Sequence, residues 1–194
     1  MTDKKEIFID RTIYNGRPED ISARLQKEGA VYDFLDSLGI EYQRIDHEPI
    51  YTIDGCEEPD KLLGIEICKN LFLCNRQKTK FYLLVIPGKK KFFSKIFSKE
   101  IGSARLSFAP EEYLEEFLDI TPGSVSVMGL MNDRDKKVEL YIDSDILKEE
   151  YFGCHPCINT SSLKIKVKDL IEKIIPATEH EFHSVTMPWE CPEE

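Results

Sequence analysis

The chain has 194 residues, of which 41% are hydrophobic, and this size suits one compact domain with short appendages. No apolar stretch approaches the ~20 residues that a membrane-spanning helix needs, and the first residues lack the apolar core of a signal peptide. We therefore expect a cytoplasmic protein with no membrane partner. The net charge of −10 argues against a general nucleic-acid binder, because an acidic surface repels phosphate. The six irregularly spaced cysteines are expected to be free thiols.

The first third of the chain predicts two helices and a strand. Pro18 suits the start of a helix over about 19–38, which Gly39 ends. The weakly alternating segment 41–46 predicts a strand, and a short helix is expected over 57–63. These elements alternate too irregularly to suggest repeated units.

The rest of the chain predicts a hairpin followed by mixed elements. Two strands, over 67–74 and 80–86, are joined by a polar loop, and the second is apolar enough for the centre of a sheet. Beyond it the patterns predict, in chain order, a helix over 92–101, an extended segment over 105–108, an amphipathic helix from Pro110, strands over 125–131 and 137–142, a helical turn after 143–145, a strand over 164–167, and a helix over 168–175 that Pro176 stops.

This order of elements predicts the fold class. Strands and helices mix without regular βαβ alternation, so we predict an α+β fold: a single compact domain whose mixed, mainly antiparallel sheet is surrounded by helices. We expect this domain to span 19–176, with an N-terminal extension over 1–18 and a C-terminal tail over 177–194.

One segment departs from the acidic character of the whole. Residues 76–99 carry eight basic side chains and no Asp or Glu. A solvated lysine-rich hairpin explains this run, and so does a local footprint for an anionic polymer on an otherwise repulsive protein. The candidate contacts for such a polymer are Arg76, Lys78, Lys80, Lys89, Lys90 and Lys91.

Two polar insertions in apolar surroundings are the candidate site. Lys69 and Asn70 lead into the apolar run 71–73, where a lysine and an amide are costly to bury without partners. The segment 153–160 contains His155, Pro156, Asn159 and Thr160, so a turn there would gather imidazole, amide and hydroxyl groups. If the fold joins the two segments, they form a small polar pocket on an apolar scaffold, which is typical of a ligand site.

Cys154 and Cys157 form a C-x-x-C motif around His155. Zinc binding needs further ligands, and His180 and His183 are distant in sequence, so a metal site is the weaker interpretation and two thiols packed beside a turn the stronger one. A redox motif requires a strand that leads into a helix at the first cysteine. The sequence has no P-loop, dinucleotide fingerprint or nucleophile elbow, so we expect no cofactor.

Taken together, these stretches resemble a known family, the prolyl-tRNA editing proteins of the ProX and YbaK type. These aminoacyl-tRNA deacylases are free-standing relatives of the editing insertion in bacterial prolyl-tRNA synthetase. The resemblance runs from about Val31 to Ile175, in the family's order. The segments that carry it are 69–73, 105–109, 121–125, 123–133, and His155-Pro156 with Asn159-Thr160.

The resemblance implies a hydrolase that deacylates mischarged tRNA(Pro), with prolyl-tRNA synthetase as a further candidate partner. Lys69 matches the family's essential lysine, Asn70 its neighbouring amide, His155 the histidine that shapes the pocket, and Gly129 a glycine whose backbone lines it. One departure concerns Cys74, because members that remove alanine often carry a second lysine there. The substrate-binding residues that we expect are Met128, Gly129, Leu130, Ile158, Asn159 and Thr160.

Alanine is the favoured aminoacyl group, because Met128, Ile158 and the His155 ring would form a tight pocket. Removal of cysteine is the alternative within the same family. A non-catalytic protein that binds tRNA or an amino acid on the same scaffold is the alternative outside the enzyme class.

Overall fold

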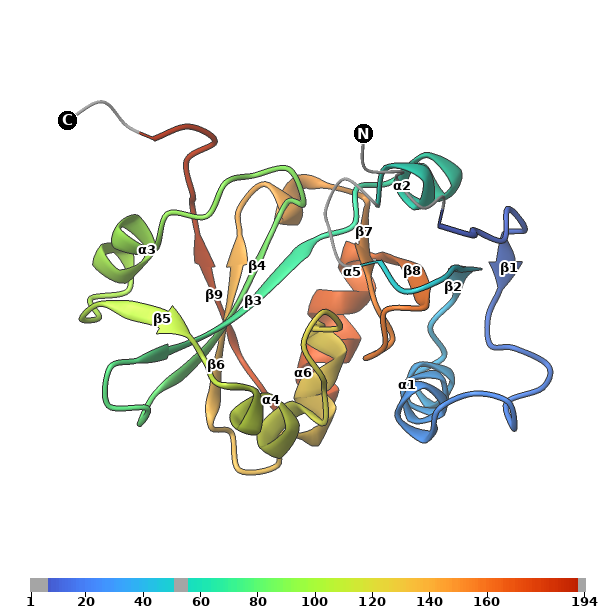
Figure 1. Cartoon of the computed structure of the whole chain (residues 1–194), viewed down its shortest axis with the longest axis horizontal. Coiled ribbons are helices and arrows are strands. Elements are labelled where there is room, and N and C mark those ends of the chain that lie inside the picture. The colour runs from blue at the N-terminus through green and yellow to red at the C-terminus, as the bar shows by residue number, and fades with distance from the viewer. Residues whose placement is uncertain (1–6, 51–55, 192–194) are drawn as a thin grey trace, which may run out of the picture.

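The computed structural model describes residues 7–50 and 56–191, whose strands form two sheets (Figure 1). The first sheet has the order β1-β2-β8-β7 and is antiparallel throughout. Its strands are β1 (Tyr14–Asn15), β2 (Tyr42–Asp46), β8 (Ser161–Lys166) and β7 (Tyr151–Cys154). Tyr42 pairs with Ile165, and Phe152 pairs with the same residue from the other side, so β8 lies in the middle of this sheet.

The second sheet has five strands in the order β5-β3-β4-β6-β9. Its strands are β5 (Leu106–Phe108), β3 (Lys69–Asn75), β4 (Phe81–Ile86), β6 (Val138–Asp143) and β9 (Phe182–Val185). The pairs that β3 forms are antiparallel, whereas β4–β6 and β6–β9 are parallel, so the sheet is mixed. Every residue of β4 is buried, which agrees with its position at the centre of the sheet.

The helices cover the two sheets and fill the space between them (Figure 1). The α-helices are α1 (Gln26–Ser37), α2 (Glu57–Leu63), α3 (Ser94–Glu100), α4 (Glu111–Leu118), α5 (Val167–Asp169) and α6 (Ile175–Ala177). Three further helical segments are the 3₁₀ helices η2 (Val127–Asn132) and η3 (Ile146–Lys148) and the π-helical turn η4 (Leu170–Ile174). None of the helices in the described ranges is long and apolar enough to cross a membrane.

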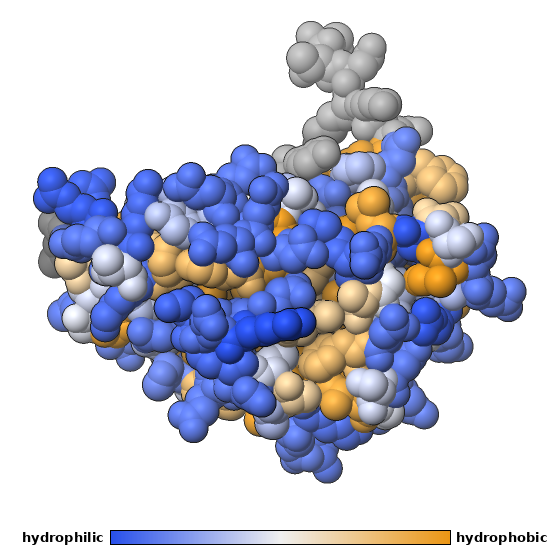
Figure 2. Space-filling model, turned by 90° about the horizontal axis from the view of Figure 1, so that it is seen from below, coloured by the Kyte–Doolittle hydropathy of each residue, from blue (hydrophilic) through white to orange (hydrophobic). Residues whose placement is uncertain are grey.

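The alternation of β3 and β4 divides the apolar core between the two faces of the five-stranded sheet. Phe72 and Leu83 belong to the main core, which also contains Leu35 of α1, Leu118 of α4 and Leu163 of β8. The opposite face carries a smaller cluster, with side chains from β3, β4, β6 and β9 packed against Phe97 of α3. On the outer surface seen from below Figure 1, apolar side chains show in a band surrounded by hydrophilic ones (Figure 2).

The structure confirms the α+β class and most of the expected elements, but several details differ. The strands form two sheets instead of one. The first helix begins at Gln26, later than position 19. The N-terminal and C-terminal segments also contribute to the sheets, because β1 pairs with β2 and β9 pairs with β6. A further difference is that Pro176 lies inside the last helical segment, whose π-helical turn precedes it. A wider turn accommodates a residue that lacks an amide hydrogen and crowds the carbonyl one turn back.

The predicted strand over 125–131 is wrong, since residues 127–132 form η2. Ser126 begins this 3₁₀ helix, and its side chain accepts a hydrogen bond from the backbone N–H of Met128 at 3.2 Å. Gly129 lies against the end of α4, where an added Cβ would be 2.6 Å from Ile120 Cδ1 and 3.0 Å from Leu118 Cβ. The glycine is therefore explained by close packing of η2 on the residues around the end of α4.

Candidate active site

Lys69 is the first residue of β3, and its half-buried ammonium is held by the backbone. Its Nζ donates a hydrogen bond to the carbonyl oxygen of Lys90 at 2.8 Å. Burial lowers the pKa of Lys69, because a desolvated ammonium is less stable, and the nearby Glu66 carboxylate opposes this shift. The site thus offers a fixed donor whose charge is only partly solvated.

The side chain of Asn70 lies on the face of β3 opposite to that of Lys69, because successive side chains alternate along a strand. Its Nδ2 donates to the carbonyl of Cys68 at 3.2 Å, whereas its buried Oδ1 has no hydrogen-bond partner in the described part of the chain. A buried acceptor without a partner is costly, and such a group is a natural point for a ligand donor.

Asn70 lines a recess of about 250 Å³ at the edge of β3. The wall is mainly apolar, and Gly123 contributes a turn with φ of 89°, a conformation that favours glycine. The other lining residues are Leu71, Phe72, Phe108, Ala109, Glu111, Leu114, Pro122 and Val125. The recess thus combines mainly apolar walls with the polar side chains of Asn70 and Glu111, which is the usual composition of a small-ligand site.

His155 follows β7 directly, and its hydrogen bond identifies the tautomer. Nδ1 lies 2.9 Å from the carbonyl oxygen of Ser161. Because a carbonyl only accepts, Nδ1 carries the proton and Nε2 is the acceptor of the ring. Burial lowers the pKa of His155 to about 4, an effect that the Ser161 carbonyl opposes and the neighbouring His47 ring reinforces. The imidazole is therefore neutral at physiological pH.

His47 supports this imidazole from the end of β2, in the same four-stranded sheet as β7. The two rings meet edge to face with their centroids 6.1 Å apart. His47 Nδ1 donates to the carbonyl of Glu48 at 2.9 Å, and Nε2 lies 2.8 Å from the Ser162 hydroxyl. Sequence patterns did not single out His47, and only its position directly after the predicted strand over 41–46 hinted at it.

The two predicted polar segments meet at the joint between the sheets. Ile67 forms an isolated parallel bridge with Gly153, and Cys68 N donates to the carbonyl of Gly153 at 2.9 Å. Lys69 and His155 each lie two residues beyond this bridge on chains that run the same way. The fold therefore brings the two segments to one joint, although no hydrogen bond among the described residues connects the two side chains.

The expected substrate-binding residues have other surroundings. Met128 and Leu130 are 0% and 1% exposed within the main core, and Gly129 packs on α4, so these three residues do not line the recess with Asn70. The structure replaces them there with Gly123 and Val125, which come shortly before η2 in the chain.

The turn between β7 and β8 holds the other three expected residues. Ile158 is buried, and Asn159 and Thr160 are half-buried. Their backbone carbonyls accept hydrogen bonds from Ile50 N at 3.4 Å and from His47 N at 3.0 Å. The described contacts therefore give Asn159 and Thr160 a role in holding the segment that carries His47.

The basic segment divides into exposed and buried lysines. Arg76, Lys78 and Lys80 are exposed on the β3–β4 hairpin, and Lys89 and Lys91 are exposed after β4. Lys90, in contrast, is 0% exposed, and its ammonium contacts the carboxylates of Asp143 and Asp145. The expectation that Lys90 contacts a polyanion is therefore corrected, because this charge is already neutralised inside the protein.

The C-x-x-C motif contains two buried free thiols. Burial raises the pKa of Cys157 to about 12 and that of Cys154 well above its usual value. Groups of three or more His, Cys, Asp or Glu side chains that would suit a metal ion do not occur among residues 7–50 and 56–191. Packing of two inert thiols is the interpretation that these contacts support.

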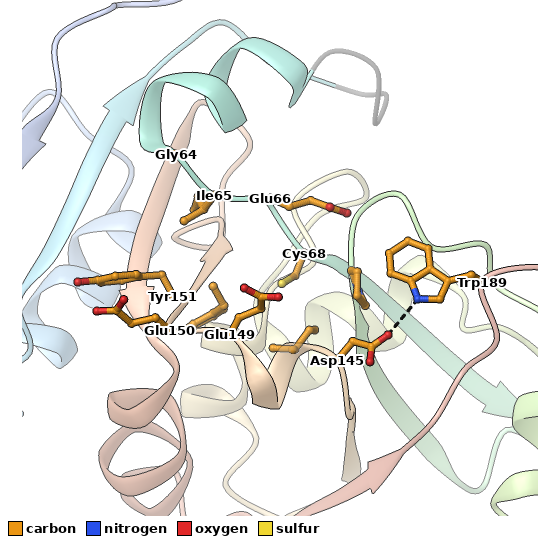
Figure 3. Close-up of a pocket in the computed structure, with 12 residues that line it drawn as sticks. Gly64, Ile65, Glu66, Cys68, Asp145, Glu149, Glu150, Tyr151 and Trp189 are labelled. Carbon is orange, nitrogen blue, oxygen red and sulfur yellow. Dashed lines mark hydrogen bonds between the residues drawn. The ribbon is translucent and has the colours of Figure 1, made fainter.

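A second cavity, of about 300 Å³, lies beside Cys68 (Figure 3). Glu66, Glu149 and Glu150 stand around it, and Trp189 from the C-terminal segment closes one side. The indole Nε1 donates to Asp145 at 3.0 Å, as the dashed line in Figure 3 marks. No motif in the sequence pointed to this cavity, since its lining comes from four separated segments.

Comparison with known proteins identifies the family. The sequence matches the family model of the aminoacyl-tRNA editing domain over residues 47–173. It is 35% identical over 158 residues to the prolyl-tRNA editing protein ProX of Acetoanaerobium sticklandii, which covers 81% of this chain and 96% of that protein. It is 27% identical over 158 residues to prolyl-tRNA synthetase associated domain-containing protein 1 of Danio rerio, which covers 80% of this chain and 84% of that protein.

A solved structure agrees at the level of the fold. The crystal structure of hypothetical protein APE2540 superimposes with a TM-score of 0.60 and 20% sequence identity, covering 79% of this chain and 96% of that one. The expected enzyme class, an aminoacyl-tRNA deacylase, is confirmed by the family match. The chain belongs to the aminoacyl-tRNA editing domain family, as the resemblance of its motifs predicts.

Proposed function

We propose that this protein hydrolyses the ester of mischarged tRNA(Pro), with alanine as the amino acid removed. The observation that carries the proposal is the buried Asn70 Oδ1, an acceptor without a described partner beside a recess of about 250 Å³. An α-ammonium group is the donor that an aminoacyl ester would supply to this oxygen. The 35% identity to a prolyl-tRNA editing protein supports tRNA(Pro) as the carrier.

The reaction requires little covalent chemistry from the protein. An aminoacyl ester is already activated, so hydrolysis needs a positioned water and stabilisation of the charge that develops on the ester oxygens. Lys69 supplies positive charge for the reacting ester or the terminal phosphate, and it is held in place by the Lys90 carbonyl before substrate arrives. Such preorganised charge is the largest contribution in many acyl-transfer enzymes.

The neutral His155 acts as an acceptor in this proposal. Its Nδ1–H is occupied by the Ser161 carbonyl, so Nε2 is the atom that receives a hydrogen bond from a water molecule or from the substrate. Because burial keeps the pKa of His155 at about 4, the ring stays neutral near pH 7 and does not repel the α-ammonium of the substrate.

Selection against proline follows from the size of the site. A synthetase pocket built for proline discriminates poorly against smaller amino acids, since a missing methylene is worth only ~1–3 kcal/mol. A second site that admits alanine and excludes the proline ring supplies the missing selectivity. Phe72, Leu114 and Val125 contribute side chains to the walls of the recess, and these set its size.

The tRNA itself would contact the exposed basic residues. Arg76, Lys78, Lys80, Lys89 and Lys91 form a local positive region on a chain whose net charge is −10. Acidic surroundings disfavour other docking orientations, so the charge pattern supports one mode of approach.

A deacylation panel tests this function. Alanyl-, cysteinyl- and prolyl-tRNA(Pro) are each incubated with the wild type, with Lys69→Ala, and with Asn70→Ala. Lys61→Ala is the matched control, because Lys61 is exposed on α2 and pairs only at 3.8 Å with Glu57. We expect the alanyl ester to be hydrolysed fastest and both site variants to lose activity, while the control keeps it.

Each other outcome has a definite meaning. Faster release of cysteine assigns the protein to cysteine removal, and full activity of Lys69→Ala removes that lysine from the mechanism. Saturable tRNA binding without turnover by the wild type indicates a binding protein. Repeating the panel with added prolyl-tRNA synthetase tests the proposed partner, which would increase the rate.

A further inference from the structure

Lys90 is a fully buried lysine that the reaction outlined above does not use as a cation. Its Nζ lies 2.9 Å from both carboxylate oxygens of Asp143 and 2.8 Å from Asp145 Oδ2. An ammonium has three hydrogens, so these three oxygens satisfy it completely. A buried charge persists only with such partners, which means that the position of the Lys90 side chain is closely defined.

The C-terminal segment, residues 182–189, completes this cluster. It begins with β9, which pairs with β6, the strand that ends at Asp143. Beyond β9, Met187 N donates to Asp143 Oδ2 at 3.1 Å, and Trp189 Nε1 donates to Asp145 Oδ2 at 3.0 Å (Figure 3). The Lys90 ammonium also lies 5.0 Å from the centroid of the Trp189 ring, within the range of a cation–π contact.

The backbone of Lys90 also holds the side chain of Lys69. The Lys90 carbonyl accepts the hydrogen bond from Lys69 Nζ at 2.8 Å, and the Lys90 N–H closes a turn on the Pro87 carbonyl at 3.0 Å. The side chain of Lys90 therefore anchors the turn whose carbonyl fixes the Lys69 ammonium. The route runs from the indole to Asp145, then to the Lys90 ammonium, and then through its main chain to Lys69.

We propose that the C-terminal segment positions the Lys69 ammonium through Lys90, so that Lys90 and Trp189 are positioning residues of the active site. The family model ends at residue 173, so the C-terminal segment lies outside the matched editing domain, whereas Lys90 and its two aspartate partners lie within it. The consequence of this positioning for catalysis rests on the proposed role of Lys69. Its physical basis, the hold of Lys90 on Lys69, is independent of that role.

Weakening the hydrogen bond between Lys69 and the Lys90 carbonyl should change the protonation of Lys69 in one direction. The carbonyl dipole stabilises the protonated amine, so a weaker hydrogen bond makes the neutral amine of Lys69 more abundant. The charged group that acts directly on Lys69 is Glu66, just before β3. The ion pairs of Lys90 with Asp143 and Asp145 reach Lys69 only through the Lys90 main chain. A substitution at Trp189 alters only the far end of this route and leaves Glu66 unchanged.

The experiment compares Trp189→Phe and Trp189→Ala with the wild type. Phenylalanine removes the indole donor and keeps a ring over Lys90, whereas alanine removes both. Lys148→Met is the matched control, since the exposed Lys148 binds Asp145 Oδ1 at 2.8 Å, whereas the indole and the Lys90 ammonium share Asp145 Oδ2. The half-exposed Trp189 is a site where substitution leaves the core intact.

Two readouts are measured across pH. The first is acylation of the Lys69 amine by a dilute anhydride, followed by mass spectrometry of its peptide, because only the neutral amine reacts. We expect labelling at pH 8 to rise about threefold in Trp189→Phe, the equivalent of half a pKa unit, and further in Trp189→Ala. The second is the pH profile of alanyl-tRNA deacylation, whose alkaline limb should shift to lower pH.

The outcomes separate the two proposals. The positioning role is overturned if both Trp189 variants give the same labelling curves as the wild type. It is also overturned if Lys148→Met changes the labelling of Lys69 as much as the Trp189 variants do. If labelling changes as expected but the wild type hydrolyses no mischarged tRNA, the positioning role stands and the proposed function fails. A uniform loss of activity at all pH values, without a change in labelling, indicates a structural effect only and also overturns the inference.

Discussion

Substitution of Gly153 by alanine would test whether the close approach of the two sheets holds the site together. Gly153 lies in β7 at the bridge to Ile67, and an added Cβ would be 2.8 Å from Ile67 Cα and 2.7 Å from Ile65 Cδ1. The isoleucine side chain can turn away, but the backbone atom cannot. The new methyl group must therefore separate the strands.

The expected cost combines two contributions. Overpacking of a rigid site costs about 1–3 kcal/mol, and a weakened hydrogen bond from Cys68 N to the Gly153 carbonyl adds about 1 kcal/mol. The free energy of unfolding should fall by about 2–4 kcal/mol. For a chain of this length, that loss lowers Tm by about 5–15 °C. Deacylation should fall as well, because Lys69 and His155 both follow the bridge by two residues.

Urea titration followed by circular dichroism measures the change, and Gly29→Ala provides the matched control. Gly29 lies inside α1, where an added Cβ would have an ordinary contact of 3.4 Å with Ile21 Cγ1. Alanine is the better helix former by about 1 kcal/mol, so this control should be more stable than the wild type. A Gly153→Ala protein with wild-type stability and activity would refute the reasoning.

Three further predictions concern pH, packing and salt. Because the pKa of His155 in the folded protein is about 4 and that of an unfolded histidine is ~6.5, the unfolded chain binds more protons between these values. Stability should therefore decrease as pH falls from 6.5 to 4, by on the order of 2 kcal/mol in urea titrations, and an equal slope in His155→Asn would contradict this assignment. Gly129→Ala should lower the free energy of unfolding by about 1–3 kcal/mol without changing KM for alanyl-tRNA, whereas a change in KM at wild-type stability would return Gly129 to the substrate pocket. Lys91→Ala should reduce the salt dependence of tRNA binding by about 0.9 in the log–log slope, and an unchanged slope would place the tRNA elsewhere.

The elements that periodicity located are those with strong local signals. The apolar run of β4 and the amphipathic stripe of α4 were predicted almost to the residue. β9 was missed because Phe182–Val185 is short and half-polar, and it exists through its pairing with β6. Local patterns carry no information on such a partner.

In the candidate site too, residues with a local sequence signal could be predicted, and those that depend on distant partners could not. Lys69, Asn70 and His155 could be singled out because polar groups in apolar surroundings need an explanation, and the fold brings their segments to one joint. The role of Lys90 could not be predicted, because three successive lysines look alike and the partners Asp143 and Asp145 are more than fifty residues away in sequence. The error over 125–131 has a similar cause, since alternating apolar residues also fit a 3₁₀ helix capped by Ser126.

Because side chains alternate along β3, its first two residues, Lys69 and Asn70, have different roles. Lys69 shares a face with Leu71 and Leu73, which belong to the cluster under α3, whereas Asn70 shares the face of Phe72 and the main core. In the proposed mechanism, Asn70 thus meets the aminoacyl group in the recess, and the ammonium of Lys69 approaches the ester from the side of the ribose and phosphate. Selectivity should accordingly depend on the walls around Asn70, and the rate for every amino acid on how firmly the Lys90 carbonyl holds Lys69.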